Sequence, residues 1–121
     1  MPDVLAVVNA FLRDHGPMTI VADTGDALFG SVDLATTNVM GPGYYSTMGF
    51  AVPAAIGMQA ASGARPLVLV GDGAFQMTGP EIAHCPRYGL NPIVLLLNNG
   101  SWETQRAYCP GARFNDIIRW P

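Results

Sequence analysis

Two aliphatic runs, each followed by a polar turn, constrain the fold of this chain most strongly. Residues 66–70 read Pro-Leu-Val-Leu-Val, and residues 92–97 read Pro-Ile-Val-Leu-Leu-Leu. Parallel strands that helices bury on both faces carry near-continuous apolar runs rather than alternating ones. A helical pattern separates the two runs. This stretch therefore predicts a strand, a crossover helix and a second strand parallel to the first.

Further strands and helices are predicted around this unit. The expected elements are a helix over 4–15, a strand over 18–22, a short helix over 27–34, a strand over 36–40, a helix over 50–61 and a short helix over 101–107. Strands that alternate with helices are typical of an α/β chain. We expect three layers, α/β/α, with a mostly parallel sheet in the middle.

The helix between the two aliphatic runs has a predicted start and a predicted interruption. Thr78 to Glu81 matches a capping box, with Thr78 as N-cap and Glu81 three residues later. The helix would then end at Gly89. Pro86 falls inside it and removes a hydrogen bond to the Ile82 carbonyl, at a cost of about 3 kcal/mol in an unbroken helix. Either the helix is kinked at Pro86 or the chain is impaired there.

Polar residues follow the two aliphatic runs, at Asp72 and Asn99. The carboxyl ends of neighbouring parallel strands face one crevice, so both side chains can reach one ligand. Mg²⁺ takes one or two carboxylates together with phosphate oxygens and water. Asp72 would supply the carboxylate, Asn99 an amide oxygen, and the turn ending at Ser101 a backbone carbonyl. Gly71 and Gly73 would let the backbone approach an anion, so the pattern predicts Mg²⁺ beside a diphosphate.

A second polar turn, Asp23-Thr24-Gly25-Asp26, follows the strand predicted over 18–22. One interpretation is a simple turn from strand to helix, capped by the Asp or Thr side chain. The other is contact with a ligand in the same crevice. The sequence pattern alone leaves both open.

The spacing of the two polar turns is similar to a known motif. Gly71-Asp72-Gly73 is followed by 24 residues (74–97) and then by Asn98-Asn99. This resembles the thiamine diphosphate motif of the thiamine diphosphate-dependent enzymes, in their C-terminal diphosphate-binding domain. Residues 71–79 and 98–103 look most like phenylpyruvate and indolepyruvate decarboxylases. The resemblance implies thiamine diphosphate and Mg²⁺ as cofactors, with the metal held by Asp72, Asn99 and the main-chain oxygen of Ser101.

The resemblance also implies which residues contact the cofactor. Met48, an ordinary core residue on its apolar pattern alone, would wedge between the two cofactor rings, and main-chain groups of Ser46 and Met48 would bind the pyrimidine. Glu103 would be a contact or an ordinary solvated carboxylate. The implied contacts are Thr24, Gly25, Asp26, Ser46, Met48, Gly71, Asp72, Gly73, Ala74, Asn99, Ser101, Trp102 and Glu103.

The activity implied is non-oxidative decarboxylation of a 2-oxo acid, such as phenylpyruvate or indolepyruvate, to an aldehyde and CO₂. Pyruvate decarboxylases and many indolepyruvate decarboxylases carry a glutamate where this chain has Gln105, so the resemblance argues against pyruvate and fits the phenylpyruvate-like branch. We assign no catalytic residue to this chain, because the family's proton-transferring glutamate and histidines belong to a pyrimidine-binding domain. The complete enzyme is expected to be a homo-oligomer, and the isolated chain is expected to be inactive.

Two alternatives are open, and the sequence argues against a third. The chain is a truncated, non-catalytic module that binds cofactor or occupies an interface, or it belongs to another thiamine diphosphate enzyme such as an acetolactate synthase-like lyase. A dinucleotide-binding protein would need Gly-x-Gly-x-x-Gly, but Gln76 stands at the third glycine position. The motif therefore argues against nicotinamide or flavin dinucleotides.

The composition indicates what kind of surface the chain has and which partners it is expected to bind. Of 121 residues, 50% are hydrophobic and only 12% are charged, which predicts apolar surface that other polypeptide covers. A net charge of −3 without lysine argues against nucleic acid. Cys85 and Cys109 lack metal-ligand spacing and are expected to be free thiols. We expect one domain over 1–121, incomplete at its C-terminus, in a cytoplasmic protein without a membrane span.

Overall fold

Four strands form one sheet in which each neighbouring pair is parallel, in the order β2-β1-β3-β4. The computed structural model describes residues 1–36 and 38–116. Its elements are α1 (Pro2–His15), β1 (Ile20–Ala22), α2 (Asp26–Ser31), β2 (Val39–Met40), α3 (Ala51–Ser62), β3 (Leu67–Gly71), α4 (Asp72–Thr78), the 3₁₀ helix η1 (Gly79–His84), α5 (Cys85–Tyr88), β4 (Ile93–Leu97), α6 (Glu103–Tyr108) and the 3₁₀ helix η2 (Arg113–Asp116). The parallel α/β fold is confirmed. The strand predicted over 36–40 is shorter, and its Thr37 lies outside the described residues.

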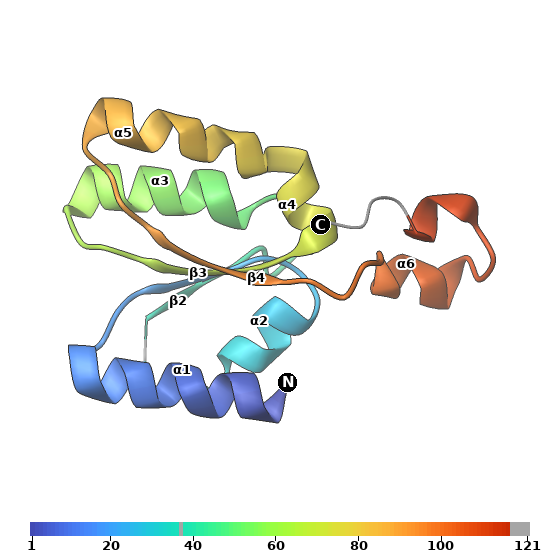
Figure 1. Cartoon of the computed structure of the whole chain (residues 1–121), viewed down its shortest axis with the longest axis horizontal. Helices are drawn as coiled ribbons and strands as arrows, with labels where there is room; N and C mark the ends of the chain where they lie inside the picture. Colours follow the sequence, from blue (N-terminus) through green and yellow to red (C-terminus); the bar gives the residue numbers. More distant parts are fainter. Residues whose placement is uncertain (37, 117–121) are drawn as a thin grey trace.

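Helices cover both faces of the sheet. Figure 1 shows α1 and α2 on one face and α3, α4 and α5 on the other. Leu67 and Leu69 of β3 pack into the core cluster on the α1 face, whereas Val68 and Val70 pack into the cluster on the α3 face. The central strands are aliphatic throughout because both faces of the sheet are buried cores. The three-layer architecture follows from this alternation.

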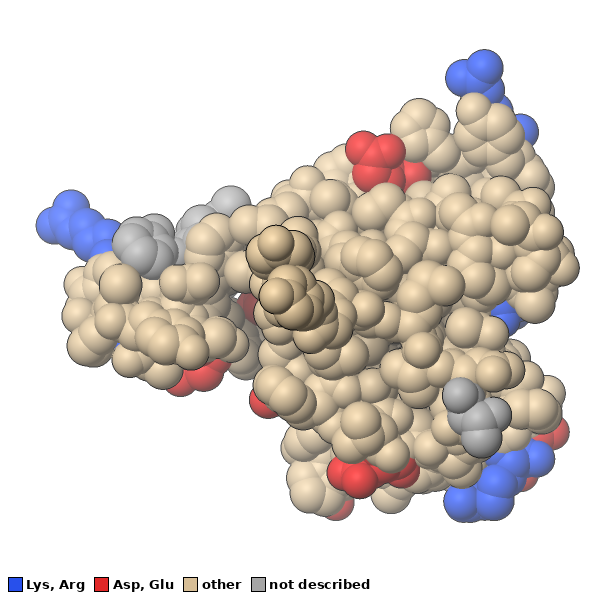
Figure 2. Space-filling model, turned by 180° about the vertical axis from the view of Figure 1, so that it is seen from behind, with Lys and Arg blue, Asp and Glu red and all other residues tan. Residues whose placement is uncertain are grey.

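β4 is less covered than the central strands. All five residues of Ile93–Leu97 are only half-buried, whereas Leu67 to Val70 of β3 are buried. Figure 2 shows a face whose charged side chains lie mainly at the margins, with most of the surface uncharged. Tyr44 and Tyr45 are among the large exposed side chains. These observations agree with the apolar surface expected from the composition.

The start of the crossover helix differs from the prediction. α4 begins at Asp72, directly after β3, and η1 and α5 continue the helical course. Thr78 makes no side-chain cap on η1, so the predicted capping box is wrong. Its hydroxyl instead donates to the carbonyl oxygen of Gly49 at 2.8 Å. A tertiary hydrogen bond has replaced the local one.

Pro86 interrupts no continuous α-helix. The 3₁₀ helix η1 ends at His84, and α5 begins at Cys85 with Pro86 in its first turn, where a missing N–H is tolerated. The N–H of Cys85 bonds the Ile82 carbonyl. The change from 3₁₀ to α-helix therefore accommodates the proline.

The prediction of free thiols is confirmed. Cys85 is buried, Cys109 is exposed, and both are free. Within residues 1–36 and 38–116, no helix combines the length and the apolarity that crossing a membrane requires.

Replacing Val68 by alanine should destabilise the fold. Val68 is fully buried in β3, so the substitution removes apolar burial and leaves a cavity, at a cost of about 2–4 kcal/mol. Urea unfolding followed by circular dichroism measures the change. Val7→Ala is the matched control, because Val7 is 69% exposed on α1, and it should change stability by less than about 0.5 kcal/mol. Equal losses of stability in Val68→Ala and Val7→Ala would contradict the burial of β3 on both faces of the sheet.

Candidate functional site

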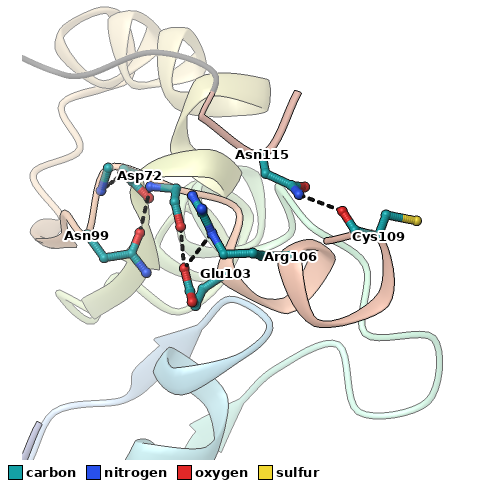
Figure 3. Close-up of polar contacts among 8 residues, drawn as sticks. Asp72, Asn99, Glu103, Arg106, Cys109 and Asn115 are labelled. Atoms are coloured by element: carbon teal, nitrogen blue, oxygen red, sulfur yellow. Dashed lines mark hydrogen bonds and ion pairs between the residues drawn. The ribbon is translucent and has the colours of Figure 1, made fainter. Parts of the chain in front are cut away.

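A buried carboxylate connects the ends of β3 and β4. Asp72 is the first residue of α4 and is 4% exposed. Its Oδ1 accepts the N–H of Gly73 at 2.8 Å, and its Oδ2 accepts the N–H of Gly100 at 2.7 Å. Gly100 belongs to the turn after β4, next to Asn99, and Figure 3 shows this group of residues. The structure thus brings the two predicted polar turns together.

The oxygens of this group suit a hard cation. The N–H of Ser101 donates to Oδ1 of the exposed Asn99 at 3.0 Å. Carboxylate and amide oxygens each have two lone pairs, so the hydrogen bonds described leave acceptor capacity on both Asp72 and Asn99. The described bonds to Asp72 come from neutral N–H groups, which stabilise its negative charge without neutralising it. One carboxylate with amide and main-chain oxygens fits Mg²⁺.

This site differs from a metal centre made of side chains alone. The part of the chain that the structure describes contains no group of three or more His, Cys, Asp or Glu residues that could hold a metal ion. A cation at Asp72 would therefore depend on Asn99, on main-chain oxygen and on oxygens from a ligand such as a phosphate. The metal-binding role of Asp72, Asn99 and Ser101 stays a prediction.

Trp102 lies over the start of α4. A Cβ atom added to Gly73 would approach Trp102 Cδ1 to 2.1 Å and Nε1 to 2.2 Å. Gly73 has an ordinary helical backbone within α4, and Gly71 has an extended one, with φ −73°. Glycine is thus required at position 73 because the indole of Trp102 packs closely against its main chain. Around Gly71, no atom of the described residues other than its chain neighbours lies within 4 Å of a built Cβ, which leaves room for an anion.

Glu103 forms a local surface network. It accepts a hydrogen bond from the Ser101 hydroxyl and pairs with Arg106, whose Nε lies 3.3 Å from Oε2 (Figure 3). The Glu103 side chain is 66% exposed. The sequence left two interpretations of Glu103, a cofactor contact and an ordinary solvated carboxylate. These local contacts and the high exposure are typical of a solvated carboxylate in the first turn of a helix. Contact between Glu103 and a cofactor stays a prediction.

The turn after β1 lies at the same edge of the sheet. A Cβ built on Gly25 would lie 3.7 Å from the Thr104 hydroxyl oxygen of α6, so the turn after β1 lies close to the first turn of α6. Gly25 is the N-cap of α2, without a side-chain cap, and the exposed Asp26 is the first helical residue. Neither predicted capping side chain is used. Contact of Thr24, Gly25 and Asp26 with a cofactor stays a prediction.

Asp23 is the residue that sequence reasoning missed. It directly follows β1 and is fully buried. Its carboxylate accepts backbone N–H groups from Thr24, Gly49 and Ala51. Its position at the end of a buried strand is the same as that of Asp72, and this parallel was the available signal.

The segment before α3 has an unusual backbone. Ser46 has φ +52°, the only positive value at a non-glycine among the described residues. Met48 is half-buried and packs against the core cluster on the α3 face, as in the core interpretation. Ala74 is buried in the same cluster, so only its main chain is available to a ligand. The wedge role of Met48 and the ring contacts of Ser46 stay predictions.

The geometry defines a class of protein: a parallel α/β domain with a candidate metal and anion site where the turns after β1, β3 and β4 meet. The sequence matches the family described as thiamine pyrophosphate enzyme, C-terminal TPP binding domain, over residues 23–109. The chain belongs to this family. Thiamine diphosphate is the family's cofactor, which confirms the cofactor implied by the motif at Asp72 and Asn99.

Curated relatives are decarboxylases. The chain is 50% identical to indole-3-pyruvate decarboxylase of Azospirillum brasilense over 120 residues, which is 98% of this chain and 22% of that protein. It is 32% identical over 106 residues to alpha-keto-acid decarboxylases of Mycobacterium bovis and Mycobacterium tuberculosis, covering 84% of this chain and 19% of those proteins. The resemblance to indolepyruvate decarboxylases is confirmed. The chain spans about a fifth of the length of these relatives.

Gly73→Ala should displace the Trp102 indole. The new methyl group overlaps the ring, and overpacking costs about 1–3 kcal/mol, which exceeds the gain of up to about 1 kcal/mol in helix propensity. The indole N–H resonance of Trp102 should shift, and urea unfolding should show lower stability.

The matched control for this prediction is Gly57→Ala in α3. Nothing lies within 4 Å of a Cβ built at Gly57, so this variant should gain up to about 1 kcal/mol. The double variant Gly73→Ala with Trp102→Ala should cost less than the sum of its two single variants. Additive costs would show that residue 73 and the indole do not touch.

Proposed function

We propose that this chain is the thiamine diphosphate- and Mg²⁺-binding part of a non-oxidative 2-oxo acid decarboxylase. The observation that carries the proposal is the buried Asp72 carboxylate, bonded to Gly100 of the turn that also holds Asn99 and Ser101. Family membership supports the cofactor. The names of the relatives support the reaction, since they are decarboxylases of indole-3-pyruvate and of alpha-keto acids.

The chain's own residues have defined tasks in this proposal. Asp72, Asn99 and the Ser101 carbonyl hold Mg²⁺, and the open backbone at Gly71 admits the diphosphate. When bound, the thiazolium of thiamine diphosphate supplies the electron sink that lets a 2-oxo acid lose CO₂. The Thr24 to Asp26 turn borders the diphosphate and the thiazolium. Orientation and charge compensation are therefore this chain's contribution.

The substrate proposed is an aromatic 2-oxo acid such as indolepyruvate or phenylpyruvate. The 50% identity to an indole-3-pyruvate decarboxylase supports indolepyruvate, and the non-acidic Gln105 fits phenylpyruvate. The pyrimidine half of the site is proposed to come from a pyrimidine-binding domain outside these 121 residues. Assembly into a homo-oligomer and a cytoplasmic location are part of the proposal and rest on the family resemblance alone.

Asp72→Asn should weaken thiamine diphosphate binding in the presence of Mg²⁺ by about tenfold to hundredfold. The amide keeps the shape of the side chain and one acceptor oxygen but removes the charge that attracts the cation. Isothermal titration with Mg²⁺, and again with a chelator, measures the effect. Asp14→Asn, an equal loss of charge at an exposed position of α1, is the control and should bind as the unmodified chain does. Unchanged affinity in Asp72→Asn would refute the metal site.

The 121-residue chain should bind cofactor without releasing CO₂ from indolepyruvate or phenylpyruvate. Among its residues we assign no proton-transferring group to the pyrimidine ring, and such groups contribute about 10²- to 10⁴-fold each. A coupled aldehyde assay and CO₂ detection measure turnover. Robust decarboxylation by this chain would contradict the proposal that other polypeptide completes the site.

A non-catalytic cofactor-binding module is the second candidate. A pyrimidine-binding domain supplied on a second polypeptide distinguishes the two. Turnover that appears on mixing supports the decarboxylase. Binding that persists with no turnover in the mixture supports the non-catalytic module.

A further inference from the structure

Asp23 forms more hydrogen bonds than a simple turn residue needs. It has no exposed surface. Its Oδ1 accepts the N–H of Thr24 at 3.0 Å and the N–H of Gly49 at 3.1 Å, and its Oδ2 accepts the N–H of Ala51 at 2.8 Å. One buried carboxylate thus connects the end of β1 with the segment that leads into α3, 26 and 28 residues further along the chain.

Gly49 is held from both sides of its main chain. Its N–H donates to Asp23, and its carbonyl accepts the hydroxyl of Thr78, at the end of α4, at 2.8 Å. The residue has φ +82°, and a Cβ there would lie 3.1 to 3.3 Å from atoms of Thr78 and Met77. The position of the backbone at 49 is therefore determined by three elements: β1, α4 and the start of α3.

The Asp23 and Thr78 side chains both bond the main chain next to Met48. Met48 directly precedes Gly49 and is half-buried against the α3-face core. A shift of the Gly49 peptide would move Met48 and the strained Ser46, because they lie on the same short loop. Capping of α3 alone would explain only the bond to Ala51. The bonds to Gly49 from Asp23 and Thr78 need a further reason.

We infer that Asp23 and Thr78 are positioning residues that hold the Met48-Gly49 backbone in the place where it receives the ring portion of the cofactor, and that neither contributes to holding its diphosphate. This inference rests on the proposed function. Asp72, at the end of β3, serves the metal and the diphosphate, whereas Asp23, at the end of β1, serves the ring. The two buried carboxylates therefore divide recognition of one ligand between them.

The test compares two ligands, thiamine diphosphate and inorganic diphosphate, each titrated with Mg²⁺ into the 121-residue chain by calorimetry. Asp23→Asn places an amide N–H₂ against backbone donors and leaves at least one of them unpaired. Affinity for thiamine diphosphate should fall about tenfold or more, while affinity for inorganic diphosphate should change less than about twofold. Asp72→Asn should weaken both ligands.

Thr78→Val provides a second route, because it removes only the hydroxyl bond to Gly49 and keeps the side-chain shape. It should weaken thiamine diphosphate by about threefold to tenfold, and Thr78→Ser should restore binding. Urea unfolding shows whether Asp23→Asn folds. If it does not fold, the inference is tested with Thr78→Val and Thr78→Ser alone. Thr36→Val is the matched control, since its hydroxyl also donates to a main-chain carbonyl, that of Met18, before β1 begins. It should bind both ligands normally.

The outcomes separate the inference from the proposed function. If the unmodified chain binds neither ligand, the proposed function is wrong and the inference falls with it. If the unmodified chain binds thiamine diphosphate and both Thr78→Val and a folded Asp23→Asn bind it equally well, only the inference is wrong. If Asp23→Asn and Thr78→Val weaken the binding of thiamine diphosphate and of inorganic diphosphate equally, the two residues have only a structural role. That result would also overturn the inference.

Discussion

The hydrogen bond between the Asp72 carboxylate and the Gly100 N–H is the contact on which the rest of the candidate site depends. It joins the turns after two adjacent strands and brings Asn99 and Ser101 toward the same carboxylate. A buried carboxylate is expensive unless hydrogen bonds or a cation compensate it. The backbone N–H groups supply part of that compensation, and in the proposed function Mg²⁺ supplies the rest. Stability and ligand binding would then be coupled at one side chain.

The same arrangement occurs twice in this fold. After β1 and after β3, an aspartate that is nearly or fully buried accepts N–H groups from a segment distant in sequence. Each carboxylate thereby determines where a neighbouring loop lies above the carboxyl ends of the strands. Binding residues on loops need such supports, because loops lack the repeated hydrogen bonds of helices and sheets.

Sequence reasoning reached the strands and the main polar residues because local patterns encode them. The aliphatic runs of β3 and β4 predicted parallel neighbours, and Asp72 and Asn99 followed from the strand ends. Thr78 was misassigned because the capping-box pattern considers only nearby donors, whereas its actual partner, Gly49, is 29 residues away. The roles of Asp23 and Trp102 were missed for the same reason. Their contacts depend on tertiary packing, which no local spacing records.

The contact between Gly73 and Trp102 has an evolutionary consequence. Because the indole occupies the space that a Cβ at 73 would fill, the two positions are epistatic. A lineage can gain a side chain at 73 only after residue 102 has become smaller or has moved, whereas residue 102 can shrink first without a clash. The order of substitution is therefore directional, and descendants that carry alanine at 73 should have lost the tryptophan earlier in their history.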